Sequence, residues 1–192
     1  MARRLGRDDS VSRTALMDAV AAIMIRDGYA ELSARKIALE SSLNYQLVFY
    51  YFQTIEELFL ETYRRRTAQL LESYKVALDS PKPFHALWVL ATNRTDGVLS
   101  IEYMAMSNHY ASIRSESIRH VRQIIAEMQA ALPESVSLVG ESDVEINCVT
   151  LAFLVSSIGN YSIFQQSQGI SEPGLEVAEL VSLLLDNLEP DG

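Results

Sequence analysis

Apolar residues recur along the first part of the chain with the spacing of one helix face. Five positions follow the i, i+3, i+4, i+7, i+8 pattern, namely Leu16, Ala19, Val20, Ile23 and Met24. The glycine at position 28 comes where a residue with positive φ can end such a helix. Two polar residues, Ser33 and Asn44, are suitable N-caps for the next two helices. Thr54 and Glu57 have the spacing of a capping box, which predicts a long helix from about residue 55 to 78.

Helical spacing continues through the remaining sequence. It predicts further helices at about 84–94, 100–109, 113–132 and 175–188, and an uncharged helix that starts at Glu141 or Ser142 and ends near Gln165. No segment has a better claim to be a strand, and no internal repeat is visible. The pattern therefore predicts an all-α protein.

The segment LNYQLVFYYF, residues 43–52, can be interpreted in two ways, because its last four positions are all aromatic. As a strand it would be apolar on both faces and would have no neighbouring strand to pair with. As a short helix after Asn44, it places Val48 and Phe52 together on a core-facing side. Tyr45, Gln46, Tyr50 and Tyr51 then face outward. A tyrosine on such a surface can pack its ring on a partner and donate its hydroxyl to a phosphate.

The net charge of −9 argues at first against a nucleic-acid partner, but the charge is unevenly distributed. Residues 1–75 carry 11 Lys and Arg against 10 Asp and Glu, whereas the remainder carries 5 against 15. The acidic excess therefore belongs to the later part of the chain. DNA binding by the first part stays possible.

The sequence favours a reducing, cytoplasmic location. Its single cysteine, Cys148, lies in an apolar stretch and is expected to be a buried, unreactive thiol. No apolar segment of a signal peptide follows the first basic residues. The uncharged stretch 146–171 is long enough to span a bilayer, but its serines, asparagines and glutamines favour a helix buried in a soluble assembly.

Three helices within about 50 residues, with a short break between the second and third, predict a helix-turn-helix. In that motif the N-terminal end of the last helix reads base edges, and Gln46 could pair with adenine while Tyr45 or Leu47 packs on a thymine methyl. The alternative for these residues is an ordinary solvated helix face. The tail arginines Arg3, Arg4 and Arg7 could reach a groove or form a solvated tail. The predicted DNA-binding residues are Ser33, Arg35, Lys36, Asn44, Tyr45, Gln46, Leu47, Tyr50, Tyr51 and Thr54.

The segment from Arg13 to Leu58 resembles the DNA-binding domain of the TetR family of bacterial repressors. The similarity lies in Gly28-Tyr29, in SARKIA at 33–38, in SLN at 42–44, in VFYYF at 48–52 and in TIEEL at 54–58. The segment 102–117 also resembles a stretch that is common in the ligand domain of that family. Two departures are expected to alter DNA affinity: Ser42 replaces the glycine of the turn, and Ile55 replaces a lysine that often begins the fourth helix.

The resemblance implies a helix-turn-helix DNA-binding domain at residues 1–55 and an all-helical ligand-binding and dimerisation domain at residues 56–192. It implies a homodimer formed through the last two helices, which binds double-stranded operator DNA and is released by a small-molecule effector. The apolar character of 144–165 and of the last helix agrees with burial between two subunits. An alternative is a helical dimeric protein-interaction module with a degenerate helix-turn-helix.

Several side chains in the second part could line a ligand cavity, although each could equally be a core residue. These candidates are Trp88, Tyr103, Met104, Met128, Phe153 and Tyr161. His109 could couple the two domains or be structural, and His85 and His120 are interpreted as surface residues. An enzyme using His109 and Glu102 as acid and base is disfavoured, because no nucleophile motif or phosphate loop is present. No catalytic residue, metal site or cofactor is expected.

Overall fold

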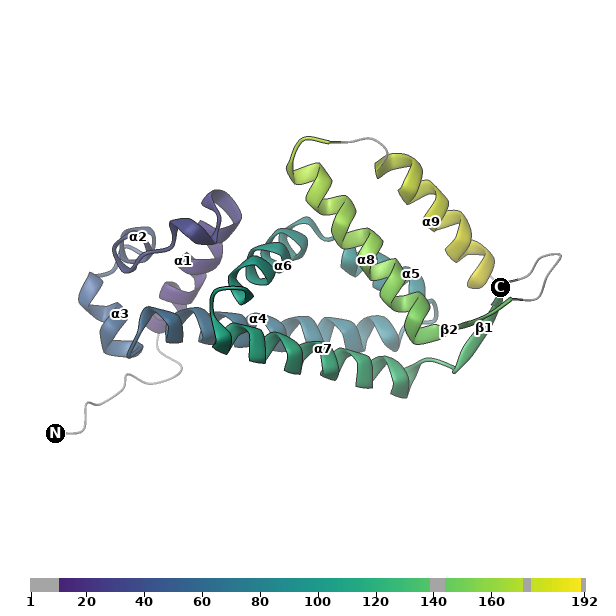
Figure 1. Cartoon of the computed structure of the whole chain (residues 1–192), viewed down its shortest axis with the longest axis horizontal. Coiled ribbons are helices and arrows are strands. Elements are labelled where there is room, and N and C mark those ends of the chain that lie inside the picture. The colour runs from purple at the N-terminus through teal and green to yellow at the C-terminus, as the bar shows by residue number, and fades with distance from the viewer. Residues whose placement is uncertain (1–10, 139–143, 171–173, 191–192) are drawn as a thin grey trace. The chain divides into compact units, whose positions relative to one another are not determined.

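The computed structural model describes residues 11–138, 144–170 and 174–190, and its described elements are mainly helices (Figure 1). The chain divides into two compact units. The first unit comprises Met1–Ala68 and Leu99–Ile118, and the second unit comprises Gln69–Val98 and Arg119–Gly192. The unit that contains the N-terminal helices thus extends beyond the expected boundary at residue 55. It includes part of the long fourth helix and two later segments.

The first unit begins with three helices and a short 3-10 turn. Their bounds are α1 Val11–Asp27, η1 Tyr29–Glu31, α2 Ala34–Glu40 and α3 Tyr45–Tyr51. The predicted caps are present, because the Ser33 side chain accepts from the Lys36 N–H at 3.2 Å and Asn44 accepts from the Gln46 N–H at 2.8 Å. Gly28 follows α1 with φ of 84°, as the sequence predicted for the end of that helix.

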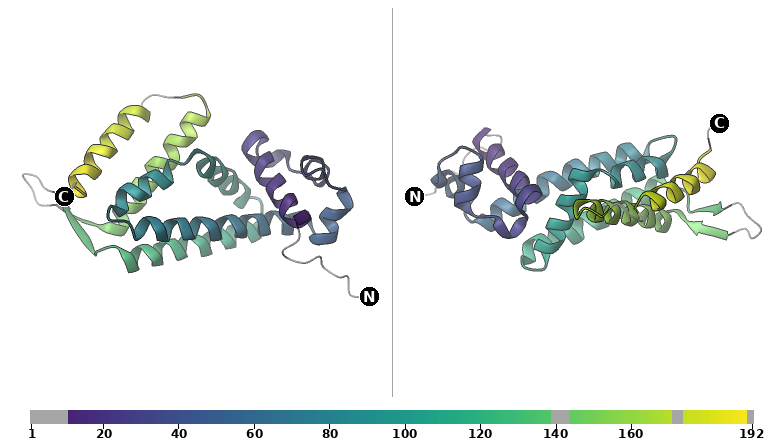
Figure 2. Two further views of the ribbon diagram at one scale, coloured as in Figure 1. Left: turned by 180° about the vertical axis from the view of Figure 1, so that it is seen from behind. Right: turned by 90° about the horizontal axis from the view of Figure 1, so that it is seen from above.

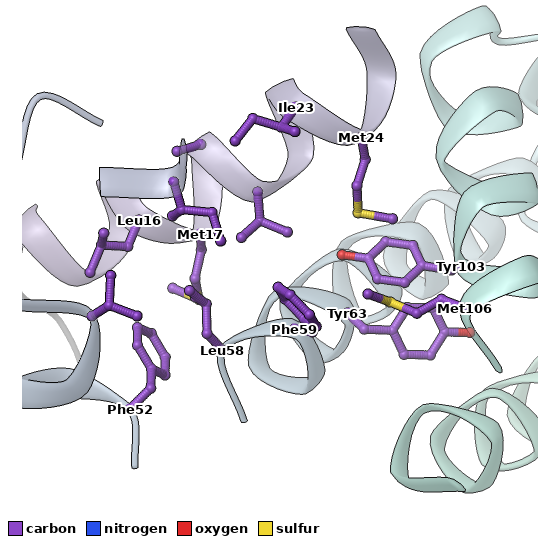
Figure 3. Packing of buried hydrophobic residues seen from close by; sticks show 14 of the residues in the cluster. Leu16, Met17, Ile23, Met24, Phe52, Leu58, Phe59, Tyr63, Tyr103 and Met106 are labelled. Atoms are coloured by element: carbon purple, nitrogen blue, oxygen red, sulfur yellow. The ribbon is translucent and has the colours of Figure 1, made fainter. Parts of the chain in front are cut away.

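Three longer helices each contribute one end to the first unit. They are α4 Ile55–Leu78, α6 Arg94–Ser107 and α7 Ala111–Ala131, and each continues into the second unit. One apolar core joins these ends to the first three helices (Figure 3). Leu16, Ile23 and Phe52 belong to it, as do Tyr103 and Met106 from α6. The end of α6 is therefore part of the same packed core as the predicted helix-turn-helix.

Ser42, in the turn between α2 and α3, has φ of 54°. It is the one non-glycine residue with positive φ in the described part of the chain. Ser42 replaces the glycine that related sequences have in this turn, and a glycine adopts positive φ more easily. A left-handed backbone costs a side-chain-bearing residue roughly 1–2 kcal/mol, because Cβ approaches the following carbonyl. The left-handed backbone at Ser42 therefore lowers the stability of the folded protein by about that amount.

We expect Ser42→Gly to raise the free energy of unfolding by about 0.5–1 kcal/mol, since glycine relieves the strain but gains entropy in the unfolded chain. Ser41→Gly is the matched control. Ser41 has φ of −79° and its hydroxyl donates to the carbonyls of Ile37 and Ala38 at 2.8 and 3.1 Å, so glycine there should destabilise. Chemical denaturation measures both. A Ser42→Gly protein less stable than the parent would contradict the strain argument.

The second unit contains three further helices and a small hairpin (Figure 2). The elements are α5 Pro83–Ala91, β1 Ser135–Leu138, β2 Val144–Asn147, α8 Cys148–Ser167 and α9 Gly174–Leu188. Its core contains Phe84 and Leu87 of α5, Leu151 and Val155 of α8, and Leu185 of α9. Cys148 is fully buried as predicted, and burial raises the pKa of its thiol.

The expectation that the chain contains no strand was wrong. β1 and β2 form an antiparallel pair in which Ser135 opposes Asn147 and Leu138 opposes Val144. The helix expected from Glu141 or Ser142 therefore begins only at Cys148, where the Asn147 side chain accepts from the Thr150 N–H at 3.0 Å. Both expected starting residues lie outside the described residues. Helix spacing alone did not reveal two four-residue strands.

Among the described helices, α8 is long and apolar enough to cross a membrane, judged by its length and composition alone. Its core-facing side packs closely on α5, and this close approach is possible because residue 159 is a glycine. A Cβ at Gly159 would lie 2.7 Å from the Cβ of Ala91. This side of α8, which includes Leu151, Ala152 and Val155, is buried in the core of the second unit.

The interpretation of His85 and His120 as surface residues was wrong, because both are buried or partly buried. His120 is buried, with 7% of its surface exposed. His85, at the start of α5, lies 2.7 Å from the Glu189 carboxylate through Nδ1 and 3.0 Å from Asp186 through Nε2. Glu189 also accepts the backbone N–H groups of Phe84 and His85, at 2.9 and 3.0 Å. The end of α9 therefore caps α5.

This contact should make the stability of the second unit depend on pH. Burial disfavours the imidazolium, but the hydrogen bonds to Glu189 and Asp186 outweigh it and raise the pKa of His85 above 6.5. The contribution is therefore complete below about pH 6.5 and is lost as the pH rises through the raised pKa. We expect the stability difference between the parent and His85→Gln to be largest at pH 5.5–6 and to shrink by pH 8.5. A difference independent of pH, measured by denaturation at each pH, would contradict this.

Candidate nucleic-acid interface

The helix α3 separates its side chains as the sequence predicted except at Tyr51, which was expected to face outward but is partly buried against the core. Val48 and Phe52 are buried at 0% and 1% exposure. Tyr45 and Tyr50 are 46% and 41% exposed, and Gln46 is also exposed. The aromatic segment is thus a helix with a core side and a polar aromatic side, and not a strand.

The exposed tyrosines are held by neighbouring rings. Tyr45 packs edge-on against Phe49 with centroids 5.3 Å apart, and Tyr50 packs in the same way against Tyr51 at 5.0 Å. Tyr51 and Leu47 are partly buried. Such packing restricts the rotamers of the rings and presents their hydroxyl edges in defined positions. The surface can therefore contact a partner with little further loss of side-chain entropy.

The start of α2 contains the basic residues that were expected to hold phosphates, but the two differ. Arg35 is exposed and has no carboxylate partner among the described residues. Lys36 is already paired, with its Nζ 3.0 Å from Asp27 and 3.1 Å from Glu31. The Ser33 oxygen accepts the Lys36 N–H and can still donate its own proton. Of these two residues at the start of α2, Arg35 is therefore the one whose charge is available to a phosphate, as far as the described part of the chain shows.

Thr54 precedes α4 and takes part in a close variant of the predicted capping box. Its Oγ1 accepts from the Glu57 N–H at 3.0 Å, while the Glu57 carboxylate accepts from the Gln53 N–H at 2.6 Å. The proton of the Thr54 hydroxyl remains able to donate to a phosphate oxygen. The tail arginines Arg3, Arg4 and Arg7 lie outside the described residues.

Contacts join α6 and the residues after it to the 3-10 turn η1 and to α4, and of these the sequence suggested a role only for His109. The Glu102 carboxylate of α6 accepts the Tyr29 N–H at 2.6 Å, and the Tyr29 ring lies 6.0 Å from that of His109. The two rings of Tyr63 and Tyr103 lie 4.5 Å apart in the shared core. The only local signal was Gly28, whose open turn admits the carboxylate within 3.5 Å of where a Cβ would stand.

The six predicted ligand-lining residues do not surround one cavity within either unit. Tyr103 and Met104 belong to the first unit, where Tyr103 is buried and Met104 is 68% exposed. In the second unit, Met128 is a buried core residue and Trp88 is partly buried against that core, whereas Phe153 and Tyr161 are exposed. Tyr161 lines a mainly apolar groove of about 510 Å³ between α8 and α9. The other residues of this groove are Ser157, Ile158, Ser162, Gln165, Val177, Leu180 and Val181.

The fold is shared with solved regulators. The reduced form of NemR from E. coli matches with a TM-score of 0.71 at 14% identity, over 94% of this chain and 100% of that one. A TetR transcription regulator from Haloarcula marismortui matches with a TM-score of 0.67 at 13% identity, over 92% and 97%. A protein from Saccharomonospora viridis, solved in complex with choline, matches with a TM-score of 0.70 at 16% identity, over 94% and 96%.

The sequence comparison concerns the N-terminal helices. No curated protein matches the chain by sequence. Residues 16–62 match the family model described as bacterial regulatory proteins of the tetR family. That segment contains the helix-turn-helix and the exposed side of α3. The likeness to the tetR family therefore lies in residues 16–62, and the likeness of the whole chain to solved structures is one of fold.

Proposed function

We propose that this protein is a cytoplasmic transcriptional repressor that binds a palindromic operator as a homodimer and leaves it when a small molecule binds the later helices. The observation that carries the proposal is the exposed polar side of α3, where Tyr45, Gln46 and Tyr50 stand on a helix anchored by Val48 and Phe52. A helix of this kind fits the major groove, where glutamine can pair with adenine and a ring can pack on a thymine methyl.

Apolar side chains on α8 and α9 support the proposed homodimer. Leu154 and Tyr161 of α8 are 56% and 61% exposed, and Leu180 and Leu183 of α9 are 66% and 62% exposed. Neighbouring large apolar side chains that face water are typical of a surface that binds another protein. A two-fold pairing of these helices would bring two copies of α3 to one duplex, for half-sites about 34 Å apart.

The packing of α6 supports a route from effector to DNA. Within the first unit α6 contacts the 3-10 turn η1 through the Glu102–Tyr29 hydrogen bond and α4 through the Tyr63–Tyr103 rings, and its other end belongs to the second unit. An effector that binds better to a conformation with α6 shifted would therefore favour a different setting of α3. Effector and DNA must then weaken each other's binding by the same factor.

The experiment is a selection of duplex DNA from a random pool, followed by affinity measurements at several salt concentrations and sedimentation of the complex. We expect a palindromic winner bound by two chains, with log affinity falling linearly with log salt. Absence of any enriched duplex at low salt would contradict the proposal. It would favour the alternative of a protein-interaction module with a degenerate helix-turn-helix.

A further inference from the structure

Five charged side chains of the first unit form a continuous series of ion pairs. They lie at the end of α1, in η1 and along α2. The network consists of Arg26, Asp27, Glu31, Lys36 and Glu40. Arg26 donates to Asp27 at 3.0–3.2 Å and to Glu40 at 2.8–3.1 Å. Lys36 binds Asp27 and Glu31 at 3.0 and 3.1 Å. Three carboxylates thus face two cations, and the hydrogen bond that Lys36 donates to Asp27 is the main cause that raises the pKa of Lys36.

This network matters because the neighbouring surface has almost no other charge. No charged residue occurs between Glu40 and Glu56, so the turn and the whole of α3 are uncharged. The basic residues at the start of α2 are only Arg35 and Lys36. Whether Lys36 is available therefore decides a large share of the attraction between this surface and a phosphate backbone.

We infer that Asp27 and Glu31 compete with DNA phosphates for the Lys36 ammonium and so lower the affinity of the protein for its operator. This inference rests on the proposed function. A phosphate that approaches Lys36 must compete with two carboxylates already in contact with it, and it meets their negative charge as well. Arg35 provides the contact instead. A weaker complex is easier to release, because the effector then needs a smaller difference in affinity between the two conformations.

Glu31→Gln tests the inference, because Glu31 is 61% exposed at its side chain and its removal leaves the core intact. It releases one of the two carboxylates from Lys36 and keeps the size of the side chain. We expect affinity for the selected duplex to rise about threefold to tenfold at moderate salt, with a salt slope steeper by up to about 0.9, as one added phosphate contact predicts.

Two further variants separate release of Lys36 from a general change of charge. Glu72→Gln makes the same change of charge at an exposed pair with Lys75 on the second unit, and should leave affinity unchanged. Lys36→Gln alone should change affinity less than twofold, because the ammonium is already paired. In the double variant Glu31→Gln, Lys36→Gln the gain should disappear. A circular dichroism melt checks that every variant is folded.

The outcomes distinguish the inference from the function on which it rests. If the parent binds the duplex and Glu31→Gln binds no better than Glu72→Gln, the inference is wrong and the proposed function stands. A gain that persists in the double variant also overturns it, because Lys36 is then not its source. If neither parent nor variant binds any duplex, the proposed function fails and takes the inference with it. Binding by Glu31→Gln where the parent binds weakly supports both.

Discussion

The protein with both Tyr45→Ala and Gln46→Ala should lose about 100-fold or more of its affinity for the selected duplex, since each base contact contributes roughly 1–3 kcal/mol of discrimination. Both side chains are exposed at the N-terminal end of α3, the end that reads base edges in a helix-turn-helix. The loss should be specific to sequence. Affinity for an unrelated duplex, which depends on phosphate contacts, should change much less.

The fold should survive this double substitution, because neither side chain belongs to the buried core of the first unit. Leu39→Ala is the matched control: Leu39 is 81% exposed on the neighbouring helix α2, so its truncation removes a similar apolar surface outside α3. We expect Leu39→Ala to leave both affinity and stability close to the parent. If the double variant bound the selected duplex as tightly as the parent, α3 would not be the reading helix.

Local signals in the sequence predicted most of the first unit. Helix caps involve residues two or three positions apart, so Ser33, Asn44 and Thr54 could be recognised without knowledge of the fold. The long helix α4 runs from 55 to 78 as predicted, because its capping box and the break before Pro81 mark both ends. The sides of α3 followed from the four-residue spacing of Val48 and Phe52.

Contacts between distant parts of the chain could not be predicted in this way. Glu102 meets the backbone of Tyr29 across 73 positions, and His85 meets Glu189 across 104. The burial of His120 depends on which helices pack around α7, and the pairing of β1 with β2 depends on contacts between two short segments that a helical pattern does not reveal. The ligand-lining candidates stay a prediction, because an apolar side chain fills a core and lines a cavity with the same chemistry.

Phe52→Ala should be the most destabilising of the substitutions considered, at about 3–5 kcal/mol, the usual cost of emptying a buried phenylalanine site. Phe52 ends α3 and is buried in the core of the first unit. Its ring also lies 5.0 Å from the Arg13 guanidinium of α1. Since a domain of this size is stable by only about 5–15 kcal/mol, the loss should leave the first unit marginally folded. Hydrogen exchange resolved by peptide should show lost protection in α1 and α3.

Tyr50→Ala separates anchoring from reading within the same helix. Tyr50 is 41% exposed, so its truncation should cost the fold only about 0.5–1 kcal/mol, as expected for a surface position. It should nevertheless weaken DNA binding, because its hydroxyl is predicted to reach the duplex. Phe52→Ala should lower affinity only as far as it unfolds α3, and the single tryptophan, Trp88 of the second unit, should report little change. Equal destabilisation by the two truncations would mean that α3 has no distinct outer side, and the aromatic segment would then serve packing alone.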